Sequence, residues 1–201
     1  MTRQLRIGSG ALILVFVLAG AQGCGGGSPS GPLSAPGSVR CTEVTGSIDF
    51  SPAMTDTGSA PETSTVTVHL AHCTTSGSDV TVSGGVSTSS LTGGTNSCTS
   101  LLVSRSVTVT TRWSSSKRIK PSVVEFSGFS ATATASGSGG FALPGKGHMV
   151  NVEGSFAGSD DGASSYSDLF FTEPAGQVLS DCAQPSGVAS LTVGSGQVAL
   201  S

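Results

Sequence analysis

Apolar and polar residues alternate with a period of two over most of the chain after residue 41, which is the pattern of half-buried β-strands. One such segment runs from Val44 to Phe50 and the next from residue 66 to Leu70. If these two pair as an antiparallel hairpin, Val44 lies opposite Leu70 and Cys41 lies opposite Cys73. The later alternating segments are 80–82, 107–113, 124–126, 150–156, 169–171, 191–193 and 198–200.

Turn-forming residues bound nearly all of these segments, and we expect Gly194-Ser195-Gly196 to be the turn of a C-terminal hairpin. No window after the N-terminal region shows a convincing 3.6-residue apolar stripe. We therefore predict an all-β fold: a single antiparallel β-sandwich or barrel-like domain of about 8–10 short strands over residues 41–201.

The N-terminal residues have a different pattern. Arg3 and Arg6 precede the apolar stretch 11–19, which is too short to span a bilayer and is typical of a signal peptide over residues 1–23. Cys24 follows in a context that resembles a bacterial lipobox, and 24–40 is then a lipidated cysteine with a Gly/Ser/Pro tether. The alternative is ordinary cleavage after Ala21, which would release a soluble secreted chain.

The cysteine count fits an exported protein. Five cysteines leave one unpaired, and lipidation of Cys24 leaves an even four. The hairpin register favours Cys41 with Cys73, which leaves Cys98 with Cys182, although sequence alone permits three pairings. Cys41 and Cys73 are out of step with the even-numbered apolar face, so we expect this bridge outside the core unless a bulge intervenes.

Charge is sparse. Charged residues make up 10% of the chain and the formal net charge is -3, a composition that excludes a basic nucleic-acid binder. Five cations nevertheless fall close together around the single tryptophan, Trp113: Arg105, Arg112, Lys117, Arg118 and Lys120. Trp113 with Arg112, Lys117, Arg118 and Lys120 is a candidate surface for an anionic or sugar-bearing ligand. The simpler interpretation places Trp113 in the core and the cations in a solvated loop.

Metal chemistry has weak support. The loop around Asp160 and Asp161, with Asp168 nearby, offers carboxylates of the kind that bind Ca²⁺, but the same residues suit an ordinary turn. His69 and His72 fall on opposite faces of a strand, and His148 is distant in sequence, so we predict no metal site and no cofactor.

Catalytic motifs are also lacking, because no serine has glycine at both flanking positions of a nucleophile elbow. An enzyme would need a site assembled from distant groups such as Glu125, Glu153 and Asp168. We therefore expect a chain that is not an enzyme, with a hydrolase that uses such dispersed carboxylates and histidines as the alternative.

Several strand-and-turn motifs carry a family resemblance, namely Gly46-Ser-Ile-Asp-Phe-Ser-Pro52, Pro121-Ser-Val-Val-Glu-Phe-Ser-Gly128, Gly140-Phe-Ala-Leu-Pro-Gly-Lys-Gly147 and Gly154-Ser-Phe-Ala-Gly158. In their order the chain resembles a family of exported, β-rich, largely uncharacterised proteins of actinobacteria. The resemblance covers most of 41–201 and implies no activity.

These observations lead to one functional expectation. The chain is a lipid-anchored, extracytoplasmic binding or structural module of the cell envelope. Its partners are the membrane, reached through the N-terminal lipid, and an envelope polysaccharide or protein. Nucleic acid is not expected as a partner.

Overall fold

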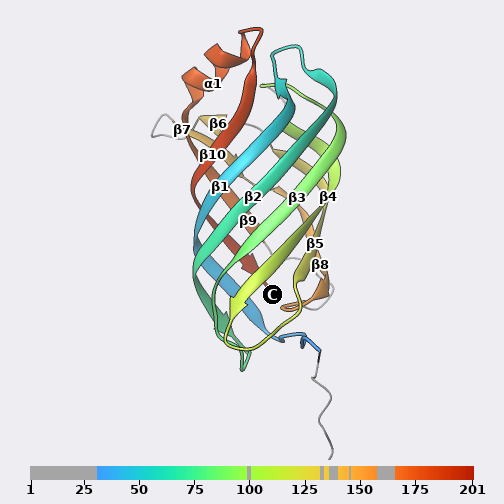
Figure 1. Ribbon diagram of the computed structural model, residues 1–201, viewed down its shortest axis with the longest axis vertical. Coiled ribbons are helices and arrows are strands. Elements are labelled where there is room, and N and C mark those ends of the chain that lie inside the picture. The colour runs from blue at the N-terminus through green and yellow to red at the C-terminus, as the bar shows by residue number, and fades with distance from the viewer. Residues whose placement is uncertain (1–30, 99–100, 132–133, 136–139, 145, 158–165) are drawn as a thin grey trace, which may run out of the picture. The chain divides into compact units, whose positions relative to one another are not determined.

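The computed structural model describes residues 31–201, apart from 99–100, 132–133, 136–139, 145 and 158–165. The predictions for residues 1–30, including Cys24, therefore lie outside the described residues. The described part forms ten strands and one helix (Figure 1), with these bounds: β1 Ser38–Met54, β2 Ser59–Ser76, β3 Val82–Asn96, β4 Leu101–Ser115, β5 Ser122–Ala131, β6 Thr134–Ala135, β7 Gly140–Pro144, β8 Lys146–Gly154, β9 Tyr166–Pro174, α1 Ala175–Cys182 and β10 Val188–Leu200. None of the helical segments described here is long and apolar enough to cross a membrane.

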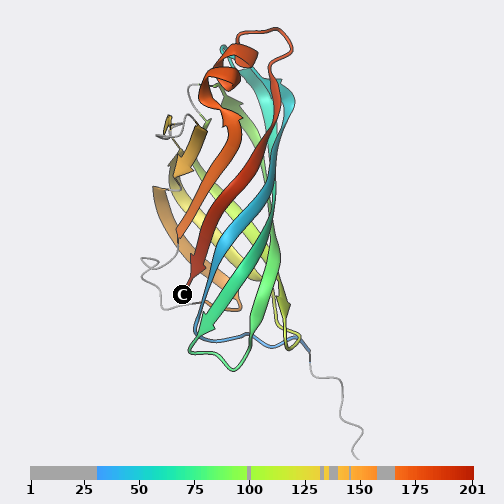
Figure 2. The same ribbon diagram turned by 90° about the vertical axis from the view of Figure 1, so that its left-hand side faces the viewer.

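All ten strands belong to one antiparallel sheet, in the order β6-β7-β9-β10-β1-β2-β3-β4-β5-β8. The sheet curls strongly around one of its faces (Figures 1 and 2), and its outermost strands β6 and β8 are not paired with each other in the described residues. The prediction of an all-β antiparallel domain is confirmed. The strands are longer than expected, because β1 to β4 have 15 to 18 residues each.

The register of the first hairpin is as predicted. Val44 pairs with Leu70, and Cys41 pairs with Cys73. β1 is also paired along its other edge with β10, where Ile48 lies opposite Leu191. The core forms where the enclosed face collects the apolar positions of these central strands, such as Val44, Ile48 and Leu191, whose side chains are at most 2% exposed.

The buried face of β1 changes from odd to even positions along the strand. Cys41 and Val44 are both fully buried, although they are three residues apart and should point to opposite faces. The register between β1 and β2 is the same at Cys41 and at Val44. The partner strand is irregular at the same level, because His72 has a φ of 51°, in the left-handed region. This paired irregularity turns Cys41 into the core. The sequence predicts the Cys41–Cys73 bridge outside the core unless a bulge intervenes. The irregularity at His72 has the effect expected of such a bulge.

Gly194-Ser195-Gly196 is not a turn, and the expected C-terminal hairpin is wrong. β10 runs without a break from Val188 to Leu200, and its register with β9 shifts between Val193 and Ser195. The two glycines therefore accommodate a bulge in one long strand. The chain reverses earlier, through α1, which the sequence did not predict because only Val178 and Cys182 of its eight residues are buried.

The folded domain begins before Cys41. Residues 32–37, called the strap here, cross one end of the sheet before β1 starts at Ser38. Leu33 bridges to Ile119, and Ala35 is 3% exposed. The boundary expected between residues 40 and 41 thus falls inside β1.

Candidate functional site

The strap lies at the end of the sheet where β1 begins and β2 ends, called the basal end here (Figure 1). The basal end consists of the strap, the β2–β3 turn (77–81), the β4–β5 turn (116–121) and residues 155–157 after β8. The predicted cationic surface falls on the β4–β5 turn and the last residues of β4. The basal end is therefore the candidate functional site.

Trp113 contributes to the packing of this end rather than to its surface. Its indole Nε1 donates a hydrogen bond to Ser122 Oγ at 2.8 Å, and its ring meets Phe156 edge-on, with centroids 5.5 Å apart. Gly85 lies directly against the ring, because an added Cβ would come within 3.1 Å of it. Ser122 in turn donates to the carbonyl of Ser155 at 2.5 Å. Trp113 thus ties β4 to β5 and to the turn after β8.

The cations, in contrast to the tryptophan ring, lie on the surface. Arg112, Arg118 and Lys120 are exposed, and no described carboxylate forms an ion pair with them. Lys117 donates a hydrogen bond to Asp79 in the β2–β3 turn. This hydrogen bond, together with the positive charge of Lys117, lowers the pKa of Asp79 below its usual value. The tryptophan ring and the cations therefore do not share one ligand surface, although they belong to the same end of the domain.

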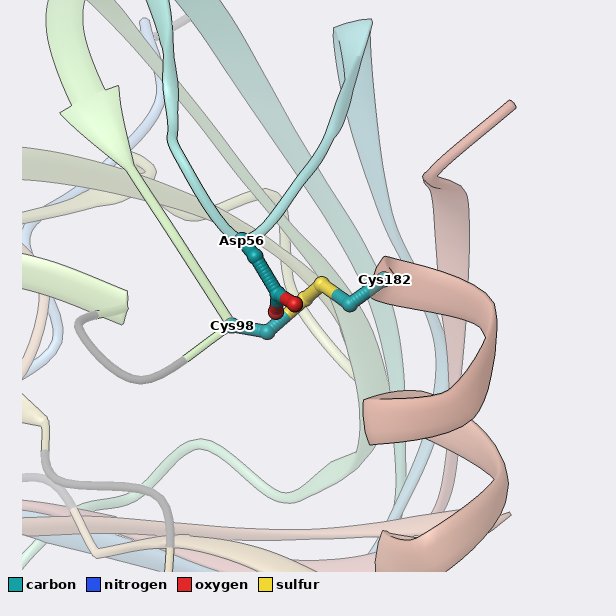
Figure 3. A group of neighbouring side chains, drawn as sticks. All are labelled: Asp56, Cys98 and Cys182. Carbon is teal, nitrogen blue, oxygen red and sulfur yellow. A yellow bond between two sulfur atoms is a disulfide. The ribbon is translucent and has the colours of Figure 1, made fainter. Parts of the chain in front are cut away.

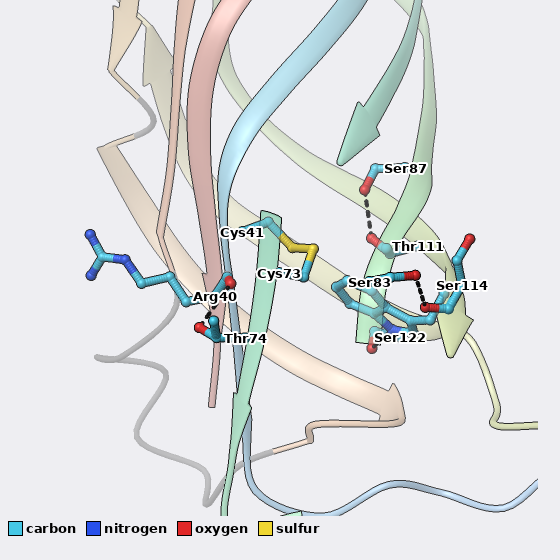
Figure 4. Close-up of a disulfide and its surroundings, with 10 residues drawn as sticks. Arg40, Cys41, Cys73, Thr74, Ser83, Ser87, Thr111, Ser114 and Ser122 are labelled. Carbon is cyan, nitrogen blue, oxygen red and sulfur yellow. Dashed lines mark hydrogen bonds between the residues drawn. A yellow bond between two sulfur atoms is a disulfide. The ribbon is translucent and has the colours of Figure 1, made fainter. Parts of the chain in front are cut away.

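A shallow depression of about 750 Å³ opens beside the β4–β5 turn. It is lined by Cys73, Thr81, Val82, Ser83 and residues 114–116. Most of its hydroxyls already have partners: Ser83 donates to the carbonyl of Ser114 (Figure 4). Ser115 and Ser116 bond to residues of the adjoining turns. The depression can accept a hydroxyl-bearing ligand only by exchanging these bonds.

The strap fastens the leading chain to the same end. The Leu33 amide donates to the carbonyl of Arg118 at 3.2 Å, and the Lys120 amide donates to the carbonyl of Leu33 at 2.8 Å. The Ala35 amide donates to Ser155 Oγ at 3.1 Å, and the Phe156 amide donates to the carbonyl of Ala35 at 2.7 Å. These bonds hold the strap between the cationic turn and the turn after β8.

The candidate metal residues are not brought together in the described structure. Asp160 and Asp161 lie outside the described residues, while the backbone of Asp168 pairs with Gln197 and Pro144 in the sheet. His72 Nε2 lies 2.9 Å from a carboxylate oxygen of Glu43, an exposed pair on the outer surface. His148 pairs through its backbone with Ser127, and its side chain lies outside the described part.

One group with metal-ligand atoms is found at the opposite end, called the distal end here: Asp56, Cys98 and Cys182, whose ligand atoms lie within 4.8 Å of one another (Figure 3). Cys98 and Cys182 form a disulfide, so neither sulfur is available as a thiolate ligand. The Asp56 amide donates to the carbonyl of Cys182 at 3.3 Å, which holds the β1–β2 turn against α1. This group therefore closes the distal end of the fold. Nothing in the pattern of residues around Asp56 predicts its place there.

The carboxylates considered for a dispersed catalytic site are also apart. Glu125 on β5 and Glu153 on β8 are both exposed, and Glu125 pairs with Val150 while Glu153 pairs with Val123. They occupy outward positions, as their alternation with apolar neighbours predicted.

Comparison with family models, with curated proteins and with solved structures found no match. The functional argument therefore rests on the residues and the geometry described above.

Proposed function

We propose that this chain is an exported protein, anchored by a lipid on Cys24, whose β domain is a binding or structural module of the cell envelope. The observation that carries the proposal is the use of the cysteines. The structure joins Cys41 to Cys73, which confirms that predicted pairing, and joins Cys98 to Cys182. Disulfides are typical of oxidising compartments, which supports export, and of five cysteines only Cys24 is left over.

The N-terminal sequence supports the same proposal. A basic start, a short apolar stretch and small residues precede Cys24, as in exported lipoproteins. The chain then enters the domain at one end of the sheet, through the strap (Figure 2). A domain attached at one end exposes its long strands and its far end to the space beyond the membrane.

A binding or structural role suits the rest of the surface. The outer faces of the central strands carry small polar side chains such as Thr65, Ser90 and Thr192, all exposed. Hydroxyl side chains on a rigid sheet can hydrogen-bond a polysaccharide or a protein partner without large rearrangement. The partner is therefore sought among envelope glycans and envelope proteins.

Replacing Cys24 by Ala tests the anchor. We expect the wild-type chain in the membrane fraction and the Cys24→Ala chain in the soluble fraction of the same cells. Ser28→Ala, four residues away in the same Gly/Ser/Pro segment, is the matched control and should stay with the membrane. Equal distribution of wild type and Cys24→Ala would contradict the anchor and favour release after Ala21. A pull-down of envelope material by the wild-type chain then identifies the partner.

A further inference from the structure

The basal end presents two exposed cations and an exposed apolar residue. Arg118 and Lys120 are exposed, the backbone of Leu33 bonds to both of them, and the Leu33 side chain is 56% exposed. An exposed apolar side chain at the same end as exposed cations can enter the interfacial region of a bilayer while the cations contact its headgroups.

The charge of this end remains positive after its pairs are counted. Asp79 neutralises Lys117. Glu153 on β8 lies opposite Val123, and no ion pair joins it to these cations in the part of the chain that the structure describes. Arg118 and Lys120 therefore carry charge that no described residue cancels.

The length of chain between Cys24 and the domain limits how far the basal end can lie from the membrane. Cys24 lies seven residues before Gly31, the first described residue, and a chain of that length spans at most about 25 Å when fully extended. An anchored chain thus keeps the basal end within a few Debye lengths of the bilayer surface.

From these three observations we propose that the basal end docks on the membrane surface, with Arg118 and Lys120 on anionic phospholipid headgroups and Leu33 among them. The proposal rests on the lipid anchor proposed above and adds a second contact to it. One acyl anchor combined with a basic patch holds a protein at a membrane more firmly than either signal alone. Docking would set the curled sheet upright, with its distal end pointing away from the bilayer.

Trp113 supplies a native probe for the test. It is the only tryptophan of the chain, and it lies at the basal end through its bond to Ser122. The lipidated full chain is reconstituted in vesicles that contain a dansyl-labelled phosphatidylethanolamine. One set is phosphatidylcholine alone, and the other is equal parts of phosphatidylcholine and phosphatidylglycerol. Energy transfer from Trp113 to the dansyl headgroups reports how close the basal end is to the surface.

We expect more transfer in the phosphatidylglycerol vesicles, and about a fivefold fall in the ratio of docked to undocked domain for each cation removed by Arg118→Gln or Lys120→Gln. The double variant should behave as wild type does in phosphatidylcholine. Arg112→Gln removes the same charge from the outer side of β4 and is the matched control, with little change expected. At about 1 M salt, where the Debye length is about 3 Å, the difference between the vesicles should disappear.

Sedimentation with the phosphatidylcholine vesicles separates the two proposals. A chain that sediments with them is anchored; if its transfer is then the same in both vesicles, or unchanged in the double variant, the docking is refuted and the anchor stands. A chain that does not sediment with them lacks the anchor, which refutes the proposed anchoring and the docking that depends on it.

Discussion

The basal and distal ends of the sheet are each closed by a disulfide, but the two bridges join different kinds of partners. Cys41 and Cys73 are already opposite each other in the β1–β2 ladder, with Cα atoms 4.0 Å apart. Cys98 and Cys182 join the residues after β3 to the end of α1, elements with no ladder between them, at a Cα distance of 6.2 Å. The basal bridge therefore reinforces a pairing that backbone hydrogen bonds already maintain. The distal bridge joins two elements that share no strand pairing.

The largest expected effect is removal of the distal bridge. The two cysteines are 84 residues apart, and the chain-entropy model assigns a loop of that length about 4.6 kcal/mol of stabilisation. We expect Cys98→Ala with Cys182→Ala to lose about 4–5 kcal/mol in urea unfolding. Amide exchange should also become faster throughout α1. If α1 stays as protected as in wild type, the distal bridge is not what holds the helix.

Removal of the basal bridge should cost less. The separation of Cys41 and Cys73 is 32 residues, for which the same model gives about 3.7 kcal/mol. In Cys41→Ala with Cys73→Ala we expect a loss of about 3–4 kcal/mol, with the cross-strand contacts between β1 and β2 preserved in NMR spectra. A shift of the β1–β2 register would show that the ladder depends on the bridge.

A glycine at each end extends the comparison. Gly154, at the basal end, has a φ of 96°, and a Cβ there would lie 1.7 Å from the carbonyl oxygen of Pro121. We expect Gly154→Ala to lose about 2–4 kcal/mol, measured by thermal unfolding. Gly176 in α1 has open space around its Cβ position, so Gly176→Ala is the matched control and should gain up to about 1 kcal/mol. Equal effects at both positions would contradict the tight packing of the basal end.

Trp113→Phe tests the polar contact within the basal end. The change keeps an aromatic ring against Phe156 but removes the hydrogen bond to Ser122, so we expect a loss of about 1–2 kcal/mol. Chemical unfolding followed by circular dichroism measures it, since the only tryptophan is lost. A neutral result would mean that Ser122 is satisfied by its bond to Ser155 alone.

The smallest effect concerns Asp79, which is fully exposed. Its hydrogen bond from Lys117 lowers its pKa, so the stabilising contribution is present above the ordinary aspartate pKa and is lost as the pH falls through the lowered value. In carboxyl NMR titrations Lys117→Gln should raise the pKa of Asp79 towards its ordinary value. Lys120→Gln, nearby and unpaired with Asp79, should leave it unchanged.

Much of the fold follows from local patterns. Period-two alternation predicted the all-β class, and it placed Val44 opposite Leu70 because side-chain parity and hairpin pairing constrain each other. The change of buried face near Cys41 did not follow, because it coincides with the left-handed backbone of His72, and a period-two pattern does not encode such a local irregularity. The pattern around Gly194 and Gly196 does not distinguish a turn from a bulge, because glycine permits both.

The candidate surface was predictable only in part. The run from Lys117 to Lys120 lies in a surface turn, which agrees with the interpretation of the cations as part of a solvated loop. Whether Trp113 joins it depends on Ser122 and Phe156, which come from other strands and turns. Leu33 was assigned to a tether because an isolated apolar residue among Gly, Ser and Pro has no period, and its bonds to the β4–β5 turn are tertiary.

The position of β1 between β2 and β10 has a consequence for how the chain folds as it is made. β2 follows β1 directly, but the other neighbour is far along the chain, since Val39 pairs with Leu200. Until Val188–Leu200 has been synthesised, β1 keeps an open edge beside the apolar side chains of Val44 and Ile48. Such an edge can pair with other unfinished chains, so we expect the protein to be most prone to aggregation in the interval before β10 joins the sheet.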